Sequence, residues 1–296
     1  MNSEVTLSIA GGFQSRARAL GRIPLWLILI LLCGWSPPAS RAGLIFDSSL
    51  GTPLTGFSPF PFDGIKTVNL DPQYAFAFEG TTYTSIAVAT SGFVWLGGTN
   101  GSQCCILSSQ TNTLNAFENG PARIAPGWAA LRPDLGASSI TFNEITDALG
   151  SRTDITFSKI ATDPNNLALS VTFQLQLFTN GTIIFSYQQF DSAQFGSNPA
   201  TLIGLTPALG SPQAVDLSKL PLTTTSSSIY DFLTTSGTGF NLSGQSFVFT
   251  PTPNGWQVSA GLPAVATPES RTVILTASAI LLLAFIGSGR RRTTGN

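Results

Sequence analysis

The sequence predicts an all-β fold, an antiparallel β-sandwich that lies between an N-terminal signal peptide and a single C-terminal transmembrane helix. Three observations lead to this fold class. Between residues 43 and 250, apolar and polar side chains alternate with period two in one segment after another. Helical periodicity is nearly absent there. The 29 glycines, 19 prolines and 21 phenylalanines of the chain favour strands and turns.

The clearest strand pattern lies in residues 168–189. Leu169 begins an alternation of large apolar residues with Ser, Thr and Gln that runs to Leu177, and a similar alternation resumes after Asn180-Gly181. An Asn-Gly pair adopts the left-handed conformations that match the twist of two paired strands. The sequence therefore predicts a β-hairpin closed at Asn180-Gly181.

Further strands are expected along the rest of this domain, including a short one near Tyr230 and Phe232. They are predicted at residues 74–78, 82–89, 92–97, 138–143, 153–160, 201–206 and 246–250. Residues 251–267 contain several prolines and little charge, which predicts an extended linker after a domain of residues 43–250.

Composition and charge exclude several classes of function. The chain has no histidine, which removes histidine-based nucleophile activation, histidine acid/base catalysis and imidazole metal ligation. Residues 43–266 hold 13 acidic against six basic side chains, whereas the two ends are basic. An acidic domain repels polyanions, so we expect no nucleic-acid partner.

Residues 1–42 are predicted to be a secretory signal peptide. Three arginines precede the apolar run Pro24–Trp35, and a small-x-small sequence ends at Ala42. Twelve apolar residues are too few for a permanent span. We expect signal peptidase to cut between Ala42 and Gly43. An uncleaved anchor and a lipoprotein signal at Cys33 are the alternatives.

A second apolar segment, residues 273–289, is predicted to form a transmembrane helix. Its 17 residues span about 25 Å as a helix. Arg290, Arg291 and Arg292 follow directly, and the positive-inside rule keeps such a cluster in the cytoplasm. Residues 43–268 would then lie outside the cell.

A Pro-Glu pair, Pro268 and Glu269, stands just before this apolar segment and the three arginines. This order closely resembles the PEP-CTERM sorting signal of exopolysaccharide-producing bacteria, here residues 268–292. The resemblance implies recognition and processing by an exosortase-type transpeptidase. The family's third motif residue is usually Pro, whereas this chain has Ser270. An ordinary tail anchor is the alternative.

Short motifs between Tyr74 and Thr206 follow one another in a recognisable order. They are Phe76-Ala77-Phe78-Glu79-Gly80, Tyr83-Thr84-Ser85, Ser91-Gly92-Phe93 with Gly97, Ile124-Ala125-Pro126 with Trp128, Phe173-Gln174-Leu175 with Leu177, and Gly181 before Phe185 and Tyr187. This order resembles the nidogen-like module, which implies an extracellular adhesion or matrix module and no enzymatic activity. From the residues themselves, we expect the aromatic landmarks to be core side chains.

Cys104 and Cys105 are adjacent, and they are the only cysteines left after the predicted signal cleavage. Export to an oxidising compartment allows a vicinal disulfide, but a bond between neighbours closes no loop and stabilises little. Two reduced thiols and an intermolecular bridge remain open alternatives. A catalytic thiol is disfavoured because no histidine can generate the thiolate.

Paired carboxylates can hydrolyse glycosides without histidine, and the candidates for such a pair are Glu79, Glu118, Glu144 and several aspartates. Their separation cannot be obtained from sequence. We interpret Asp163-Pro164-Asn165-Asn166 as a turn rather than a calcium loop. No cofactor and no metal are expected.

Together these patterns predict an exported bacterial protein of the cell surface or extracellular matrix with a structural or adhesive role and no catalytic activity. It would be membrane-anchored first and reach the surface or the medium after its tail is processed. Expected partners are signal peptidase, the exosortase-type transpeptidase, the membrane through residues 273–289, and an exopolysaccharide or a matrix protein. The alternative function is a lectin-like module or a carboxylate-based glycoside hydrolase.

Overall fold

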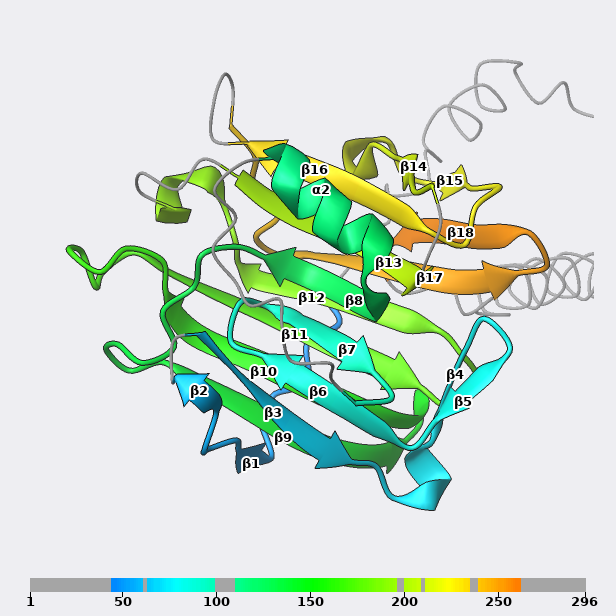
Figure 1. Cartoon of the computed structure of the whole chain (residues 1–296), viewed down its shortest axis with the longest axis horizontal. Helices are drawn as coiled ribbons and strands as arrows, with labels where there is room; N and C mark the ends of the chain where they lie inside the picture. Colours follow the sequence, from blue (N-terminus) through cyan, green and yellow to red (C-terminus); the bar gives the residue numbers. More distant parts are fainter. Residues whose placement is uncertain are drawn as a thin grey trace, which may run out of the picture. The chain divides into compact units, whose positions relative to one another are not determined.

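In the computed structural model, two β-sheets pack face to face (Figure 1). The structure describes residues 44–60, 63–98, 110–195, 200–208, 211–234 and 239–261. Within these residues each of the two sheets has eight strands, and a separate two-stranded hairpin lies at the side. The predicted all-β sandwich is therefore confirmed.

The first sheet is antiparallel throughout its described strands. In spatial order it consists of β1 (Thr52–Pro53), β9 (Ser139–Asp147), β10 (Gly150–Ala161), β11 (Ser170–Phe178), β12 (Ile183–Gln189), β17 (Gln245–Thr252), β18 (Gly255–Ala260) and β15 (Leu222–Thr223). Consecutive strands are neighbours from β9 to β12, which short hairpin connections allow.

The second sheet is antiparallel except for one short parallel pair, β14 with β16. Its order is β14 (Gln213–Ala214), β16 (Ile229–Thr234), β13 (Ala200–Ala208), β8 (Pro121–Trp128), β7 (Phe93–Leu96), β6 (Ser85–Ala89), β3 (Asp63–Asn69) and β2 (Ser58–Phe60). The side hairpin is β4 (Phe76–Phe78) and β5 (Thr81–Tyr83), and the 3-10 turns are η1 (Pro72–Tyr74), η2 (Ser192–Phe195) and η3 (Leu217–Lys219).

The predicted strands are confirmed with shifted ends, and so is the hairpin of residues 168–189, which is β11 and β12. The geometry of its turn differs from the expected one. The N–H of Gly181 donates to the carbonyl of Phe178 at 2.9 Å, so Thr179 and Asn180 are the central turn residues. Of these turn residues, only Gly181 has a positive φ, which is 86°. The turn therefore has a three-residue loop that ends in a left-handed glycine.

The inner faces of the sheets form an aromatic core. Phe157 and Phe173 stack with ring centroids 4.6 Å apart, and Phe190 meets Phe173 edge-on at 5.4 Å. Tyr187, from β12, lies 4.9 Å from Phe190. Each of these side chains is fully buried. The alternation read from the sequence thus places one face of β10, β11 and β12 inside the sandwich.

A hydrogen bond joins the two sheets at the centre of this core. The hydroxyl of Tyr187, on the first sheet, donates to the carbonyl of Pro126, on β8 of the second sheet, at 2.6 Å. Pro126 lies where the pairing of β8 with β13 shifts register, which is where a strand tolerates proline. Burial, followed by the charge of Asp231, raises the pKa of Tyr187, so this hydroxyl remains a donor.

The aromatic landmarks are core residues, as predicted. The side chains of Phe76, Phe78, Phe93, Trp95, Trp128 and Phe173 are all buried. They do not all belong to the space between the sheets. Phe93, Trp95 and Trp128 form a second cluster on the outer face of the second sheet.

A helix that the sequence analysis did not predict covers this second cluster. It is α2 (Gln110–Asn119), which lies over β13 in Figure 1. Phe117 of α2 is fully buried there, and a Cβ added at Gly204 would lie 3.0 Å from its ring. Gly204 therefore allows the helix to approach the sheet closely. Asn and Thr fill much of α2 and are weak helix formers, which is why the helix has no clear sequence pattern.

The prediction of an extended linker at residues 251–267 is wrong for its first ten residues. Residues 245–260 form the β17–β18 hairpin, and Val258 is fully buried against the inter-sheet core. The domain therefore continues to about residue 260. Prolines suggested a linker, but Pro251 and Pro253 lie at the end of the hairpin, where a missing N–H is tolerated.

Several predicted features lie outside the described residues. They are the cleavage site at Ala42 and Gly43, the cysteine pair Cys104 and Cys105, the end of the predicted linker, and the tail with Pro268, Glu269, Arg290, Arg291 and Arg292. Among the residues that the structure describes, no helix is long and apolar enough to cross a membrane. The proposed spanning segment, residues 273–289, is not among them.

Gly181→Val is expected to destabilise the domain by about 1–3 kcal/mol, because a β-branched residue resists a positive φ. Denaturant unfolding of both proteins measures the loss. Thr179→Val is the matched control, since Thr179 lies in the same turn with an ordinary φ. Equal losses from the two variants would contradict the assigned turn.

Tyr187→Phe is expected to lower the free energy of unfolding by about 1–3 kcal/mol, because the buried carbonyl of Pro126 loses its donor. The midpoint of chemical unfolding reports the effect. Tyr83→Phe, at a half-buried residue of β5, removes a hydroxyl in the same way and serves as the control. A Tyr187→Phe variant as stable as the parent would show that the bond does not tie the sheets together.

Candidate functional site

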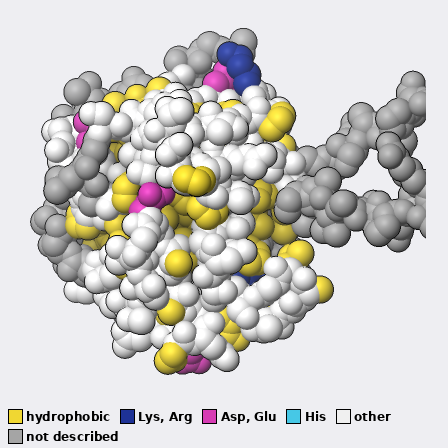
Figure 2. Space-filling view, turned by 90° about the vertical axis from the view of Figure 1, so that its right-hand side faces the viewer, with side chains coloured by type: hydrophobic (Ala, Val, Ile, Leu, Met, Phe, Trp, Pro, Cys, Tyr) yellow, Lys and Arg dark blue, Asp and Glu magenta, His cyan; other side chains and the backbone are white. Residues whose placement is uncertain are grey.

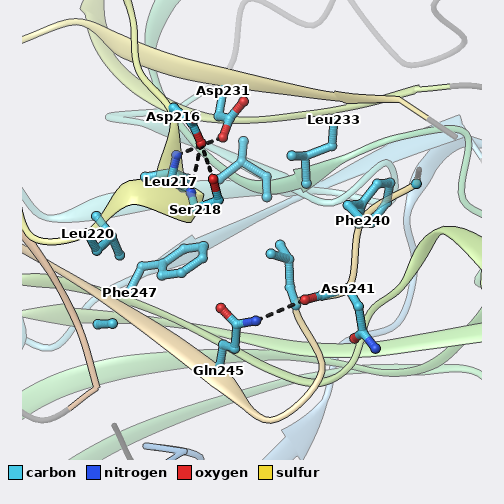
Figure 3. A pocket seen from close by; sticks show the side chains of 14 residues that line it. Asp216, Leu217, Ser218, Leu220, Asp231, Leu233, Phe240, Asn241, Gln245 and Phe247 are labelled. Carbon is cyan, nitrogen blue, oxygen red and sulfur yellow. Dashed lines mark hydrogen bonds between the residues drawn. The ribbon is translucent and has the colours of Figure 1, made fainter. Parts of the chain in front are cut away.

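The strongest candidate site in the described part of the chain is a cavity of about 590 Å³ at one end of the sandwich. Both sheets contribute to it: Ile203, Asp231 and Leu233 from the second sheet, and Gln245 and Phe247 from the first. Protein cavities that bind small-molecule ligands commonly have this size. Figure 3 shows its polar side chains at two opposite ends and its apolar side chains between them.

Two aspartates define one end of the cavity. Asp231 lies on β16 directly opposite Ile203 of β13, a core position, so strand alternation turns its carboxylate inward. Asp216 caps the 3-10 turn η3, where its carboxylate accepts the N–H of Ser218 at 3.0 Å. The same turn brings the N–H of Leu217 to Asp231, which accepts it at 2.9 Å (Figure 3).

The two carboxylates have opposite electrostatic environments. Burial raises the pKa of Asp231, and the negative charge of Asp216 raises it further against the opposing effect of the Leu217 N–H. Asp216 is exposed and bonded to Lys219 and Ser218, which lowers its pKa to about 2. Asp231 is therefore the carboxylate whose charge is costly without a partner.

The other end of the cavity carries an amide. Gln245 of β17 donates its Nε2 to the carbonyl of Asn241 at 2.9 Å, which leaves its Oε1 available as an acceptor. Leucines and phenylalanines line the sides between the two polar ends, among them Leu220, Leu233, Phe240 and Phe247 (Figure 3). Phe240 packs on Phe195 with ring centroids 5.7 Å apart, which holds that wall in place.

This arrangement suits a ligand with an apolar body and hydrogen-bond donors. The spare polar capacity of Asp231 and Gln245 is acceptor capacity. Among the described residues that line the cavity there is no Lys or Arg. An anion would meet two carboxylates there, whereas hydroxyl or ammonium groups would be accepted.

The glutamates singled out in the sequence do not come together in this cavity. Glu79 lies in the β4–β5 turn with a φ of 48°, Glu118 lies on α2, and Glu144 lies on β9, where it accepts the N–H of Asp71 at 2.9 Å. Partial burial raises the pKa of Glu79. It is also the largest cause of the raised pKa of Glu144.

Sequence reasoning placed several aspartates among the candidate carboxylates but did not single out Asp216 and Asp231. The available clue was an acid in the middle of the strand Ile229–Thr234, whose side chains are large and apolar on both faces. Tyr230 and Phe232 point outward and contact the cluster under α2. Because large apolar residues therefore occupy both faces of this strand, residue type alone does not show which face points into the sandwich.

The segment Asp163–Asn166 is a turn, as predicted. Asp163 accepts the N–H of Asn165 at 2.8 Å, and Asn166 donates to the carbonyl of Asp163 at 3.3 Å. Among the side chains that the structure describes, no group of three acids or thiols is placed to hold a metal ion.

A buried arginine lies in the outer cluster, away from the cavity. The guanidinium carbon of Arg123 is 3.6 Å from the ring centre of Trp95 and 4.2 Å from that of Trp128. Its Nη2 donates to the carbonyl of Ala116 on α2 at 3.3 Å. Burial lowers the pKa of Arg123 to about 8. Aromatic faces replace the usual carboxylate partner here, and Arg123 holds α2 on the sheet.

Charged side chains are sparse on the surface. In Figure 2 most of the visible face consists of uncharged polar side chains and backbone, with scattered hydrophobic side chains between them. Only 10% of the residues in the whole chain are charged. Such a face offers hydrogen bonds and apolar contacts rather than charge complementarity.

The comparisons with known proteins identify the family. The family model described as NIDO related matches residues 48–251, most of the described sandwich, and the chain belongs to this family. The nidogen-like resemblance seen in the strand motifs is thereby confirmed. Searches among curated proteins and among solved structures found no match.

Asp231→Asn is expected to stabilise the protein at neutral pH. Burial raises the pKa of Asp231 in the fold, so the folded state loses stability as pH rises from the unfolded pKa to the folded one. An asparagine can still accept the N–H of Leu217 without that cost. Melting temperatures of both proteins from pH 3 to 8 should diverge as pH rises, whereas a constant difference would exclude the charge as the cause.

Proposed function

We propose that this protein is an exported structural or adhesive component of a bacterial cell surface or extracellular matrix. The observation that carries the proposal is the NIDO-related match, which extends over residues 48–251 and thus over most of both sheets. A family membership of this kind is consistent with an extracellular structural module. The surface of few charges and the strand-built domain support the same role.

The proposed route is set by the two ends of the chain. Signal peptidase removes residues 1–42, and residues 273–289 hold the protein in the membrane with residues 43–268 outside. An exosortase-type transpeptidase then processes the tail near Pro268 and Glu269. The sequence patterns at both ends support this route. The position of Ile45 is consistent with it, because this residue, just after the proposed cut, packs on the sandwich.

We propose that the protein is not an enzyme and needs no cofactor. None of the three glutamates singled out for a hydrolytic pair is among the described residues that line the cavity. The cavity supports a second candidate function, a carbohydrate-binding module. Sugars present hydroxyl donors and apolar C–H faces, and the cavity offers the carboxylate of Asp231, the amide of Gln245 and the ring of Phe240.

A glycan-array and polysaccharide-hydrolysis screen of the full chain tests both functions. The structural role predicts binding to matrix material without turnover of any polysaccharide. Binding of a defined glycan that Gln245→Leu abolishes would establish the lectin-like function. Turnover that Asp231→Asn and Asp216→Asn each remove would make the protein a hydrolase and refute the structural role.

The sorting route has a separate test in a host that contains the transpeptidase. One epitope is inserted after Gly261 and another after Asn296. We expect the wild type to lose the terminal epitope, and Pro268→Ala/Glu269→Ala to keep it while staying in the membrane. Replacing Arg290, Arg291 and Arg292 by Ser should weaken or invert the anchoring. If both epitopes stay together in every protein, the tail is only an anchor.

A further inference from the structure

The first described residues form a strap across the outer face of the first sheet. This N-terminal strap, residues 44–48, is held by a row of polar side chains that are register partners on four neighbouring strands: Thr156, Gln174, Ser186 and Ser246. Ile45 donates its N–H to Ser246 Oγ at 2.9 Å and accepts the hydroxyl of Ser186. Asp47 exchanges two backbone hydrogen bonds with the amide of Gln174, at 2.8 and 3.1 Å.

Gln176 holds the strap from the next position on β11. Its Nε2 donates to the carbonyl of Ile45 at 3.0 Å and to Gln174 Oε1 at 2.8 Å. These two bonds fix the orientation of the amide, because both Nε2 protons are used. The Oε1 of Gln176 is then buried without a donor.

Asp154 on β10, next to Gln176, also has a buried acceptor atom without a hydrogen-bond donor. Asp154 is the register partner of Gln176, so the two side chains share the outer face. Asp154 is 1% exposed, and its Oδ2 accepts Arg152 Nε at 3.3 Å, whereas its Oδ1, 3.2 Å from the same nitrogen, accepts no hydrogen bond. Two buried acceptors on adjacent strands without a donor between them are costly, unless one of them carries a proton.

We propose that Asp154 is protonated and donates its proton to Gln176 Oε1, and that this hydrogen bond keeps the N-terminal strap docked. The proton satisfies both unbonded acceptors at once. It also fixes the amide of Gln176 in the orientation that binds the carbonyl of Ile45. Asp154 thus acts on the strap through Gln176.

The charges around Asp154 support a retained proton. Arg152 is its nearest cation, with Nε 3.2 Å from Oδ1, but that guanidinium also binds Asp47 at 2.8 Å and Asp147 at 2.8 Å. Three carboxylates therefore share one cation. Burial raises the pKa of Asp154 to about 7, the charges of Asp47 and Asp147 add to this, and Arg152 opposes it. The charged groups that face Asp154 are thus Asp47 on the strap, Asp147 at the end of β9 and Arg152 on β10.

Loss of the proton would reverse the orientation of the amide. An ionised Asp154 repels Gln176 Oε1 and attracts Nε2, and an amide rotated to satisfy it no longer reaches Ile45 or Gln174. A cavity of about 370 Å³ lies along the strap and is lined by Ile45, Arg152 and Gln176. Because the docked strap favours the protonated acid, docking weakens as pH rises from the pKa of Asp154 with the strap undocked to its higher pKa with the strap docked.

Hydrogen exchange of the Ile45 and Asp47 amides in the full chain tests the proposal. Protection factors, which correct for the intrinsic pH dependence of exchange, should fall by up to about tenfold per pH unit between the pKa of Asp154 with the strap undocked and its higher pKa with the strap docked, and should level off above the higher value. In Asp154→Asn, the side-chain Nδ2 donates to Gln176 Oε1 at every pH, so protection should stay constant. Asp163→Asn, in an exposed turn, is the matched control and should behave as the wild type.

A direct titration keeps the proposal testable if Asp154→Asn does not fold. The ¹³Cγ resonance of Asp154 in the wild type should titrate with a midpoint between about 6 and 8, near the pKa that its environment produces. A midpoint below about 5, or strap protection that is independent of pH in the wild type, would overturn the proposal.

Discussion

The hydrogen bond from Tyr187 to the carbonyl of Pro126 and the aromatic stack around it are the contacts on which the rest of the structure depends. Two amphipathic sheets can slide over each other while keeping their apolar faces buried, because burial alone has no direction. A buried donor and acceptor have one satisfied arrangement. The hydrogen bond from Tyr187 to Pro126 therefore sets which part of β12 lies over which part of β8.

With the sheets aligned in this way, their two outer faces are covered by different segments of the chain, α2 on one face and the N-terminal strap on the other. The face under α2 is aromatic, and it encloses Arg123 between rings and the carbonyl of Ala116. The face under the N-terminal strap is a polar row with a charged end at Arg152, closed by backbone groups of Ile45 and Asp47. One face is thus closed by apolar packing, and the other by hydrogen bonds whose strength a proton can change.

The cavity arises where the core becomes discontinuous. Around Phe157 and Phe173 large rings fill the space between the sheets, whereas near η3 the second sheet turns Asp231 inward in place of an apolar side chain. The N–H of Leu217 satisfies part of this carboxylate, and the cavity beside it leaves room for a ligand donor. The same residue thus explains both a local cost in stability and the chemistry that a ligand would meet.

The sequence by itself determined the fold class, the β11–β12 hairpin and the burial of the aromatic landmarks, because alternation and turn residues are local properties of the chain. It also identified the family. Other features were decided by tertiary contacts: α2 is a helix because the sheet buries Phe117, and residues 251–260 are a hairpin because β12 and β17 pair. The pairs Asp216 with Asp231 and Asp154 with Gln176 each join separate segments of the chain. Their chemistry comes from burial and from neighbours on adjacent strands, which no local pattern records.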